Sequence, residues 1–153
     1  MAILDIGCGG NPLFCKDEVI HADLGGVHLE VKCDAHHLPF KDNCFKIVYA
    51  SHVIEHCLDP KKVLEEFRRV SSTLVIIKVI NAKVDYACET HFYSWNEVTL
   101  ENFLKAFFKE VNIYHSVRVT PHKNILRKLL SQLKVFALFG IFGKNELTAI
   151  CYK

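Results

Sequence analysis

The segment ILDIGCGGNP, residues 3–12, passes from a short apolar strand into a turn that contains three glycines. Glycine lets the chain turn sharply and lets a ligand approach the backbone closely. In an open α/β sheet, ligands bind outside the carboxyl ends of the strands. We therefore expect a ligand to lie against this turn, although the motif alone also fits a plain turn from strand to helix.

The rest of the chain alternates between strand-like and helix-like segments. The predicted strands are residues 2–6, 18–24, 28–34, 45–50, 73–80, 111–119 and 147–153. Such alternation favours an α/β fold with a mostly parallel sheet, in a single domain over residues 1–153. The apolar, β-branched run 73–80 is typical of a central strand buried on both faces.

Two helices are marked by their first residues. Asp59 followed by Pro60 fits an N-cap and first turn, and Ser94 with Glu97 three residues later fits a capping box. A third helical pattern, about residues 121–143, is predicted as an insert between the last two strands.

Charge and cysteine content narrow the class of protein. A net charge of +2 over 153 residues does not by itself indicate a nucleic-acid binder. The seven cysteines form no CxxC pair, so we expect reduced thiols and no metal site, in a cytoplasmic protein without a signal peptide. The longest apolar run, 135–143, is shorter than the roughly 20 residues that cross a bilayer.

Two further acids end strands at the same predicted edge. Asp23 ends the second strand and Asp34 ends the third. A carboxylate can accept hydrogen bonds from both ribose hydroxyls, and another can accept one from the amine of adenine. Each acid alone is most often a solvated loop residue, but the three features together predict a nucleoside-containing ligand. The fingerprint of dinucleotide-binding sites is G-x-G-x-x-G, and counting from Gly7 and Gly9 its third glycine would stand at the position of Pro12. This argues against NAD or FAD as the ligand.

These segments resemble the class I S-adenosylmethionine-dependent methyltransferases, within the group called methyltransferase type 11. The matching motifs are LDIGCGGNP, HADL, CDAHHLPF, FKIVYASHVIEH and HFYSW, and they span about residues 3–111. The resemblance implies a Rossmann-like sheet of seven strands in the order 3-2-1-4-5-7-6, with the last strand antiparallel and helices on both faces. The helix that usually precedes the first strand is missing from this chain.

The resemblance also implies the cofactor, S-adenosylmethionine, and the residues around it. Its methionine part would be surrounded by Asp5, Gly7, Cys8 and Gly9. Asp23 would bind the ribose with Leu24 beside the adenine, and Asp34 and Ala35 would meet the adenine edge. Ser51 would lie near the methyl group that is transferred.

The acceptor side is less sharply marked. His52 follows the fourth strand and is a candidate general base, while His91 and Tyr93 are candidate substrate contacts. His52 and His56 have a spacing that can bind zinc, but no third ligand accompanies them. The exit of the fourth strand lacks the Asn/Asp-Pro-Pro-aromatic signature of enzymes that methylate amino groups of bases and of glutamine. We therefore expect in-line transfer of the methyl group to a small-molecule or lipid-like nucleophile.

Two alternatives of other classes stay open. The first is a non-catalytic, methyltransferase-like binding or regulatory subunit, and the second is an NAD-dependent oxidoreductase. Without the preceding helix, the open cofactor side could be covered in a homo-oligomer or by a partner chain. The basic helix predicted over 122–143 could also contact nucleic acid or a membrane surface.

Overall fold

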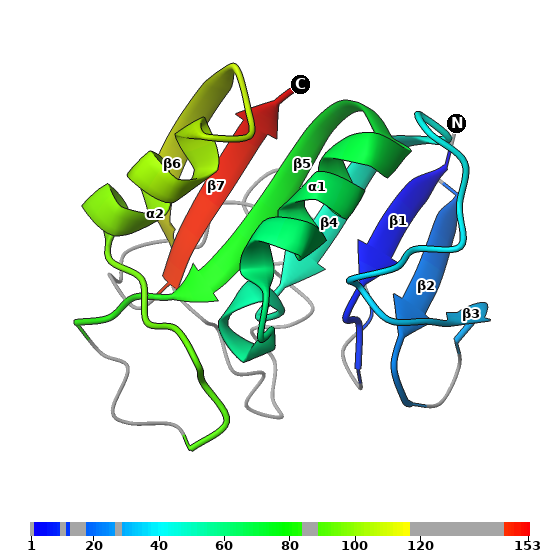
Figure 1. Ribbon diagram of the computed structural model, residues 1–153, viewed down its shortest axis with the longest axis horizontal. Coiled ribbons are helices and arrows are strands. Elements are labelled where there is room, and N and C mark those ends of the chain that lie inside the picture. The colour runs from blue at the N-terminus through cyan, green and yellow to red at the C-terminus, as the bar shows by residue number, and fades with distance from the viewer. Residues whose placement is uncertain (1, 10–11, 13–17, 27–28, 84–88, 117–145) are drawn as a thin grey trace, which may run out of the picture.

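The computed structural model describes residues 2–9, 12, 18–26, 29–83, 89–116 and 146–153. These residues form one seven-stranded sheet with the order β3-β2-β1-β4-β5-β7-β6, which confirms the predicted order (Figure 1). Only β7 runs antiparallel to its neighbours β5 and β6. The strands are β1 (Ile3–Ile6), β2 (Val19–Asp23), β3 (Val31–Lys32), β4 (Phe45–Ser51), β5 (Ser71–Ile80), β6 (Glu110–Ser116) and β7 (Glu146–Tyr152).

The third strand is much shorter than predicted. β3 has two residues in place of the seven expected over 28–34. Glu30, which precedes it, binds His21 with its side chain: one carboxylate oxygen lies 2.8 Å from the backbone nitrogen and 2.9 Å from Nδ1. The backbone nitrogen of Glu30 also donates to the carbonyl oxygen of His21 at 3.1 Å, and the strand pairing begins with Ala22 opposite Val31.

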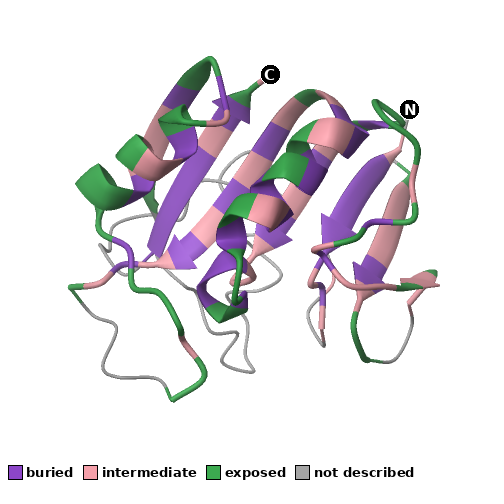
Figure 2. Cartoon of the chain, in the orientation of Figure 1, coloured by how far each residue is buried: buried purple, intermediate pink, exposed green. Residues whose placement is uncertain are grey.

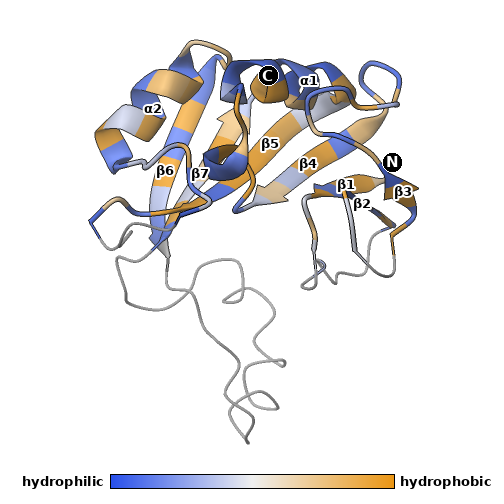
Figure 3. Ribbon diagram, turned by 60° about the horizontal axis from the view of Figure 1, so that its bottom comes forward, coloured by the Kyte–Doolittle hydropathy of each residue, from blue (hydrophilic) through white to orange (hydrophobic). Residues whose placement is uncertain are grey.

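The central strand β5 has one fully buried face and one partly exposed face, and burial of both faces stays a prediction because the segments expected on the second face lie outside the described residues. Along it, buried Val75, Ile77 and Val79 alternate with partly exposed residues (Figure 2). The reason is the placement of the helices α1 (Pro60–Val70) and α2 (Glu97–Lys105). Both lie on the same face of the sheet, α1 over β4 and β5, and α2 over β6 and β7 (Figures 1 and 3).

The helices expected on the other face are not among the described residues. The predicted insert 121–143 and most of the stretch that follows the glycine turn lie outside them. No helix within the described part of the chain is long and apolar enough to cross a membrane.

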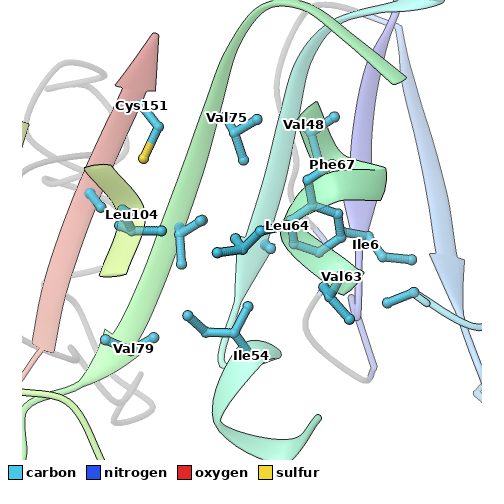
Figure 4. Packing of buried hydrophobic residues seen from close by; sticks show 14 of the residues in the cluster. Ile6, Val48, Ile54, Val63, Leu64, Phe67, Val75, Val79, Leu104 and Cys151 are labelled. Atoms are coloured by element: carbon cyan, nitrogen blue, oxygen red, sulfur yellow. The ribbon is translucent and has the colours of Figure 1, made fainter. Parts of the chain in front are cut away.

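The core lies between α1, α2 and the sheet. Leu64 and Phe67 of α1 are fully buried together with Val48 and Val75 of the sheet, and Leu104 of α2 is fully buried over β7 (Figure 4). Burial of a large apolar side chain of this kind contributes about 1.5–3 kcal/mol. The apolar face of α1 therefore fixes the helix on β4 and β5, and with it the chain that leaves β4.

An ion cluster fixes the connection between β3 and β4 to the same helix. Glu66 accepts a hydrogen bond from the backbone of Leu38 at 2.8 Å and pairs with Arg69. Arg69 also donates to the carbonyl oxygens of Leu38 and Phe40 and to the carboxylate of Asp42. This cluster holds the segment that carries the predicted adenine site against the rest of the fold.

The two helix starts follow the sequence in one case and depart from it in the other. Asp59 caps α1 as predicted, and its carboxylate accepts from the backbone nitrogens of Lys61 and Lys62. The capping box of α2 is formed by Asn96 and Thr99 instead of Ser94 and Glu97. Asparagine caps as well as serine does, and Thr99 Oγ1 completes the box by accepting from the Asn96 backbone nitrogen.

Replacing Asp59 by alanine is expected to lower the free energy of unfolding by about 1 kcal/mol, because two backbone donors of α1 lose their acceptor. Urea unfolding followed by circular dichroism measures this. Glu65→Ala, which removes an exposed carboxylate from the middle of the same helix, is the matched control and should change stability by less than about 0.5 kcal/mol. Equal effects of the two substitutions would contradict the cap.

Candidate functional site

The parallel strands bring their carboxyl ends to one edge of the sheet, the lower edge in Figure 1. A cavity of about 230 Å³ opens there between the residues that follow β1, β2, β3 and β4. Its lining residues are Ile6, Gly7, Asp23, Leu24, Cys33, Asp34, Ala35, His36, His52, Val53, His56 and Cys57. We call this cavity the edge pocket.

The turn after β1 requires glycine for two separate reasons. Gly7 has a left-handed φ of 73°, and its backbone nitrogen donates to the carbonyl oxygen of Ala22 at 2.8 Å. A Cβ atom on Gly7 would clash with Cγ2 of Val53, which lies directly across from it. Only a residue without a side chain lets the ends of β1 and β4 approach this closely.

Asp23 ties the end of β2 to the glycine turn. Its Oδ2 accepts from the backbone nitrogen of Gly9 at 2.8 Å, and its Oδ1 accepts from that of Gly25 at 3.2 Å. An ionised carboxylate has about four acceptor sites, so these two bonds leave acceptor capacity directed to the edge pocket. The sequence suggested the ligand role of Asp23 but not its bond to the turn.

Asp34 is held in the ionised state beside the pocket. Its Oδ1 accepts from the backbone nitrogen of His36 at 2.9 Å and lies 2.7 Å from His36 Nδ1. These two hydrogen bonds, the backbone one first, lower the pKa of Asp34. Because both bonds go to Oδ1, the second oxygen remains outside them and can accept a bond from a ligand.

The thiols near the pocket are neutral. Burial, together with the charges of Asp5 and Asp23, raises the pKa of Cys8 to about 11. Burial also raises the pKa of Cys57 to about 11 and shifts that of Cys33 upward. A thiol with a raised pKa is a poor nucleophile, so these side chains act as small apolar groups.

His52 lies at the exit of β4 in a left-handed conformation with φ 56°. Its Nδ1 is 3.0 Å from Oε1 of Glu55, and its Nε2 is 3.0 Å from Oε1 of Glu146. Ionised carboxylates only accept hydrogen bonds, so both ring nitrogens donate and the ring is an imidazolium. The bonds to Glu146 and then Glu55 raise the pKa of His52 to about 9, against the opposing effect of burial. A ring that holds both protons does not suit the general-base role predicted for His52.

Glu146 carries the opposite shift. Burial by itself raises the pKa of this carboxyl group, but the hydrogen bond from His52 and the nearby Lys78 outweigh burial and lower the pKa to about 2. Nζ of Lys78 lies 2.9 Å from Oε2 of Glu146. The two groups form an ion pair, but the angles between them do not fit a hydrogen bond. Lys78, His52, Glu55 and Glu146 form what we call the strand-end ion cluster, with two cationic and two anionic groups.

Because of the strand-end ion cluster, we expect the free energy of unfolding to depend on pH between about 6.5 and 9. The folded pKa of His52, about 9, lies above its ordinary value of 6.5, so its contribution is complete below pH 6.5 and is lost as the pH rises through 9. The free energy of unfolding should therefore fall over this range with a slope of at most about 1.4 kcal/mol per pH unit. Urea unfolding at pH 6.5 and 8.5 measures it. His52→Gln should remove this part of the slope, and an unchanged slope would contradict the assignment.

The segment after β5 packs on the 3₁₀ turn η1 (Ile54–His56). The carbonyl oxygen of Glu55 accepts from the backbone nitrogens of Phe92 and Tyr93, and Nδ1 of His56 lies 3.0 Å from the carbonyl oxygen of Thr90. The rings of His56 and His91 meet edge to face with 4.6 Å between their centroids. The predicted substrate contacts His91 and Tyr93 therefore lie next to His56, which lines the edge pocket.

The structure divides the predicted site residues into two groups. Gly7, Asp23, Leu24, Asp34, Ala35 and His52 line the edge pocket. The others lie outside its lining: Asp5 is buried, Gly9 bonds to Asp23, and Cys8 and Ser51 sit beside lining residues. Sequence patterns missed His36, Val53 and His56 as lining residues, and no local signal marked Glu146. Among the described residues, no group of three or more His, Cys, Asp or Glu side chains could hold a metal ion.

Comparisons with known proteins agree with this arrangement. Residues 4–73 match the family model of the methyltransferase domain. This match covers 70 of the 153 residues, and together with the order of the strands it supports the predicted family, the class I S-adenosylmethionine-dependent methyltransferases. It supports the predicted enzyme class and cofactor in the same way. No curated protein sequence matches the chain.

Three solved structures share the fold of this chain. An S-adenosylmethionine-dependent methyltransferase from Archaeoglobus fulgidus is 22% identical, with a TM-score of 0.63, and the match covers 99% of this chain and 86% of that one. A chain from the Haloferax volcanii complex between the Trm112 methyltransferase activator and a methyltransferase is 12% identical, with a TM-score of 0.66 and coverages of 99% and 81%. Phosphoethanolamine N-methyltransferase 2 of Haemonchus contortus, solved with S-adenosyl-L-methionine, is 17% identical, with a TM-score of 0.62 and coverages of 99% and 48%.

Proposed function

We propose that this methyltransferase is catalytically active and methylates a small-molecule or lipid-like nucleophile, with the cofactor bound in the edge pocket. The observation that carries the proposal is the Asp23 carboxylate, which is bonded to Gly9 and Gly25 and lines the pocket. S-adenosylmethionine, when bound, supplies an activated methyl group, so the protein's task is mainly to position donor and acceptor.

The lining residues fit the adenosyl part of the cofactor. Asp23 would accept bonds from the ribose hydroxyls and Asp34 from the adenine amine, with Leu24 and Ala35 against the ring. The volume of about 230 Å³ is below the roughly 300–1,000 Å³ of pockets that enclose whole ligands. We therefore assign the edge pocket to the adenosine end and the backbone of Gly7 to the methionine end.

Apolar side chains near the pocket support an apolar acceptor. Leu58, Phe92 and Tyr93 are 73%, 60% and 37% exposed, and the hydroxyl group of Tyr93 donates to the carbonyl oxygen of Leu58 at 3.2 Å. They adjoin η1 and the loop that follows it, where His56 and Cys57 line the pocket. Exposed apolar groups gathered beside a site favour a partly apolar ligand.

His56 is better placed than His52 to accept a proton from such a ligand. The Thr90 carbonyl oxygen can only accept, so Nδ1 of His56 donates to it, and Nε2 is the ring nitrogen left to accept a proton from a ligand. This assignment matters only for acceptors that must lose a proton, such as hydroxyl groups and ammonium groups.

Calorimetric titration tests the proposal in its first step. We expect micromolar binding of S-adenosylmethionine and S-adenosylhomocysteine and no binding of NAD. Transfer of a radioactive methyl group to apolar phenols and amines tests the second step. Cofactor binding without any transfer would favour the regulatory subunit, and binding of NAD alone would favour the oxidoreductase.

A partner chain or a second copy on the cofactor side remains part of the proposal. The Haloferax volcanii relative, which was solved with its activator, shows that this fold can assemble with a second protein. Sedimentation of the purified chain with and without S-adenosylhomocysteine tests self-association. The proposed contact of nucleic acid or a membrane with residues 122–143 concerns a segment outside the described residues.

A further inference from the structure

We propose that Glu146 is a positioning residue of the cofactor pocket, acting through the imidazolium of His52. The proposal rests on the function proposed above. Glu146 is 94 residues from His52 in the sequence and does not line the edge pocket. Because β7 is antiparallel, its first residue comes to the edge where the parallel strands end, and Glu146 pairs there with Ile80 at the end of β5.

The strand-end ion cluster holds the backbone of His52. A left-handed conformation is unfavourable for a residue with a side chain, and it persists only where its surroundings impose it. Here the backbone nitrogen of His52 donates to the carbonyl oxygen of Lys78 at 2.9 Å, and the ring is held from both sides by Glu55 and Glu146. Three contacts from η1, β5 and β7 therefore fix one residue.

His52 in turn sets the position of Val53, which forms one wall of the edge pocket. The next residue, Val53, packs directly against the backbone of Gly7 and lines the pocket together with His52. A change in the backbone at His52 would move Val53 away from the glycine turn. The shape of the proposed cofactor pocket thus depends on the carboxylate of Glu146, which does not line that pocket.

The support that Glu55 and Glu146 give to His52 depends on charge. His52 faces Glu55 from η1 and Glu146 from β7, while Lys78 from β5 faces Glu146. Glu146 is only 1% exposed, so water has little access to replace a hydrogen bond that Glu146 loses with His52. If the ring of His52 loses a proton, it can no longer donate to both carboxylates, and one of the two contacts fails.

The test is Glu146→Gln, which keeps the shape of the side chain and removes its charge. NMR of the histidine rings should show the pKa of His52, identified by its loss in His52→Gln, falling from about 9 toward 6.5. The affinity of the variant for S-adenosylhomocysteine should equal that of the wild type at pH 6 and be at least threefold weaker at pH 8. The wild type should bind equally at both pH values.

A matched control is Glu97→Gln, which removes the carboxylate from the exposed pair of Glu97 with His115, 2.9 Å apart and on other elements. It should leave binding unchanged at both pH values. If Glu146→Gln does not fold, Lys78→Met gives a result of opposite sign. Glu146 then pairs with His52 alone, the pKa of His52 rises, and binding stays flat to a higher pH than in the wild type.

The possible outcomes separate the two proposals. Equal binding losses at pH 6 and 8, or no loss at either, would overturn the positioning role. A wild type that binds no S-adenosylhomocysteine would overturn the proposed function, while the NMR titration would still report whether Glu146 sets the pKa of His52.

Discussion

Asp23→Ala is expected to weaken the binding of S-adenosylhomocysteine about 10- to 100-fold. Hydrogen bonds to a charged group contribute about 1.5–3 kcal/mol, and a tenfold change corresponds to about 1.4 kcal/mol. The substitution removes the proposed acceptor of the ribose hydroxyls. It also removes the acceptor for the backbone nitrogen of Gly9 at 2.8 Å, so the turn itself loses a tether. Calorimetric titration at pH 7 measures the change.

Asp23→Asn separates the two roles of this side chain. The amide oxygen can still accept from Gly9, whereas the amide group cannot reproduce a carboxylate that accepts on both oxygens. We expect the asparagine variant to stay folded, with a small loss of stability from the missing bond to Gly25, and to lose most of the affinity. Affinity equal to that of the wild type in both variants would contradict the ribose assignment, provided that circular dichroism shows an intact fold.

Gly7→Ala is expected to abolish measurable cofactor binding and to lower the free energy of unfolding by about 2–5 kcal/mol. A left-handed conformation costs a residue with a side chain about 1–2 kcal/mol, and overpacking adds about 1–3 kcal/mol. Both conditions hold here, because φ is 73° and the new methyl group would clash with Cγ2 of Val53. The wall formed by Val53 would have to move away from the turn. Urea unfolding and calorimetric titration measure the two effects.

Gly25→Ala is the matched control for this substitution. A Cβ atom on Gly25 meets nothing within 4 Å, and its φ is not left-handed. Its effect on stability should stay within about 0.5 kcal/mol. Adding Val53→Ala to Gly7→Ala should recover the steric part of the loss and leave the backbone part. If Gly7→Ala behaved like Gly25→Ala, the close approach of β1 and β4 at this turn would be refuted.

Local sequence patterns predicted much of the fold and part of the site. The apolar runs marked the strands, and Asp59 with Pro60 marked the start of α1, because these features depend on residues only a few positions apart. The strand order was implied by resemblance to a known family, since no local pattern says which strands are neighbours. Gly7, Asp23 and Asp34 were selected by their places at strand ends, and the structure gathers them around one pocket.

Where the structure departs from what the local patterns predict, contacts outside those patterns are involved. The strand predicted over 28–34 is shortened to β3, and Glu30, which precedes it, contacts His21 through both its side chain and its backbone nitrogen. The cap of α2 shifts to Asn96, since its amide oxygen reaches the backbone nitrogen of Thr99 at 2.9 Å. The run 73–80 has the composition of a strand buried on both faces, and within the described part of the chain α1 and α2 cover one of them.

The glycine turn, the acids at the strand ends and the periodicity of the helices can be recognised in the sequence, because each depends on the chemistry of near neighbours. The imidazolium state of His52 between Glu55 and Glu146 follows from the folded arrangement alone. That state depends on the antiparallel course of β7, which places a carboxylate 94 residues away at the exit of β4. Proton affinity depends on which charges and how much water surround a group in space, and the order of residues along the chain does not state this.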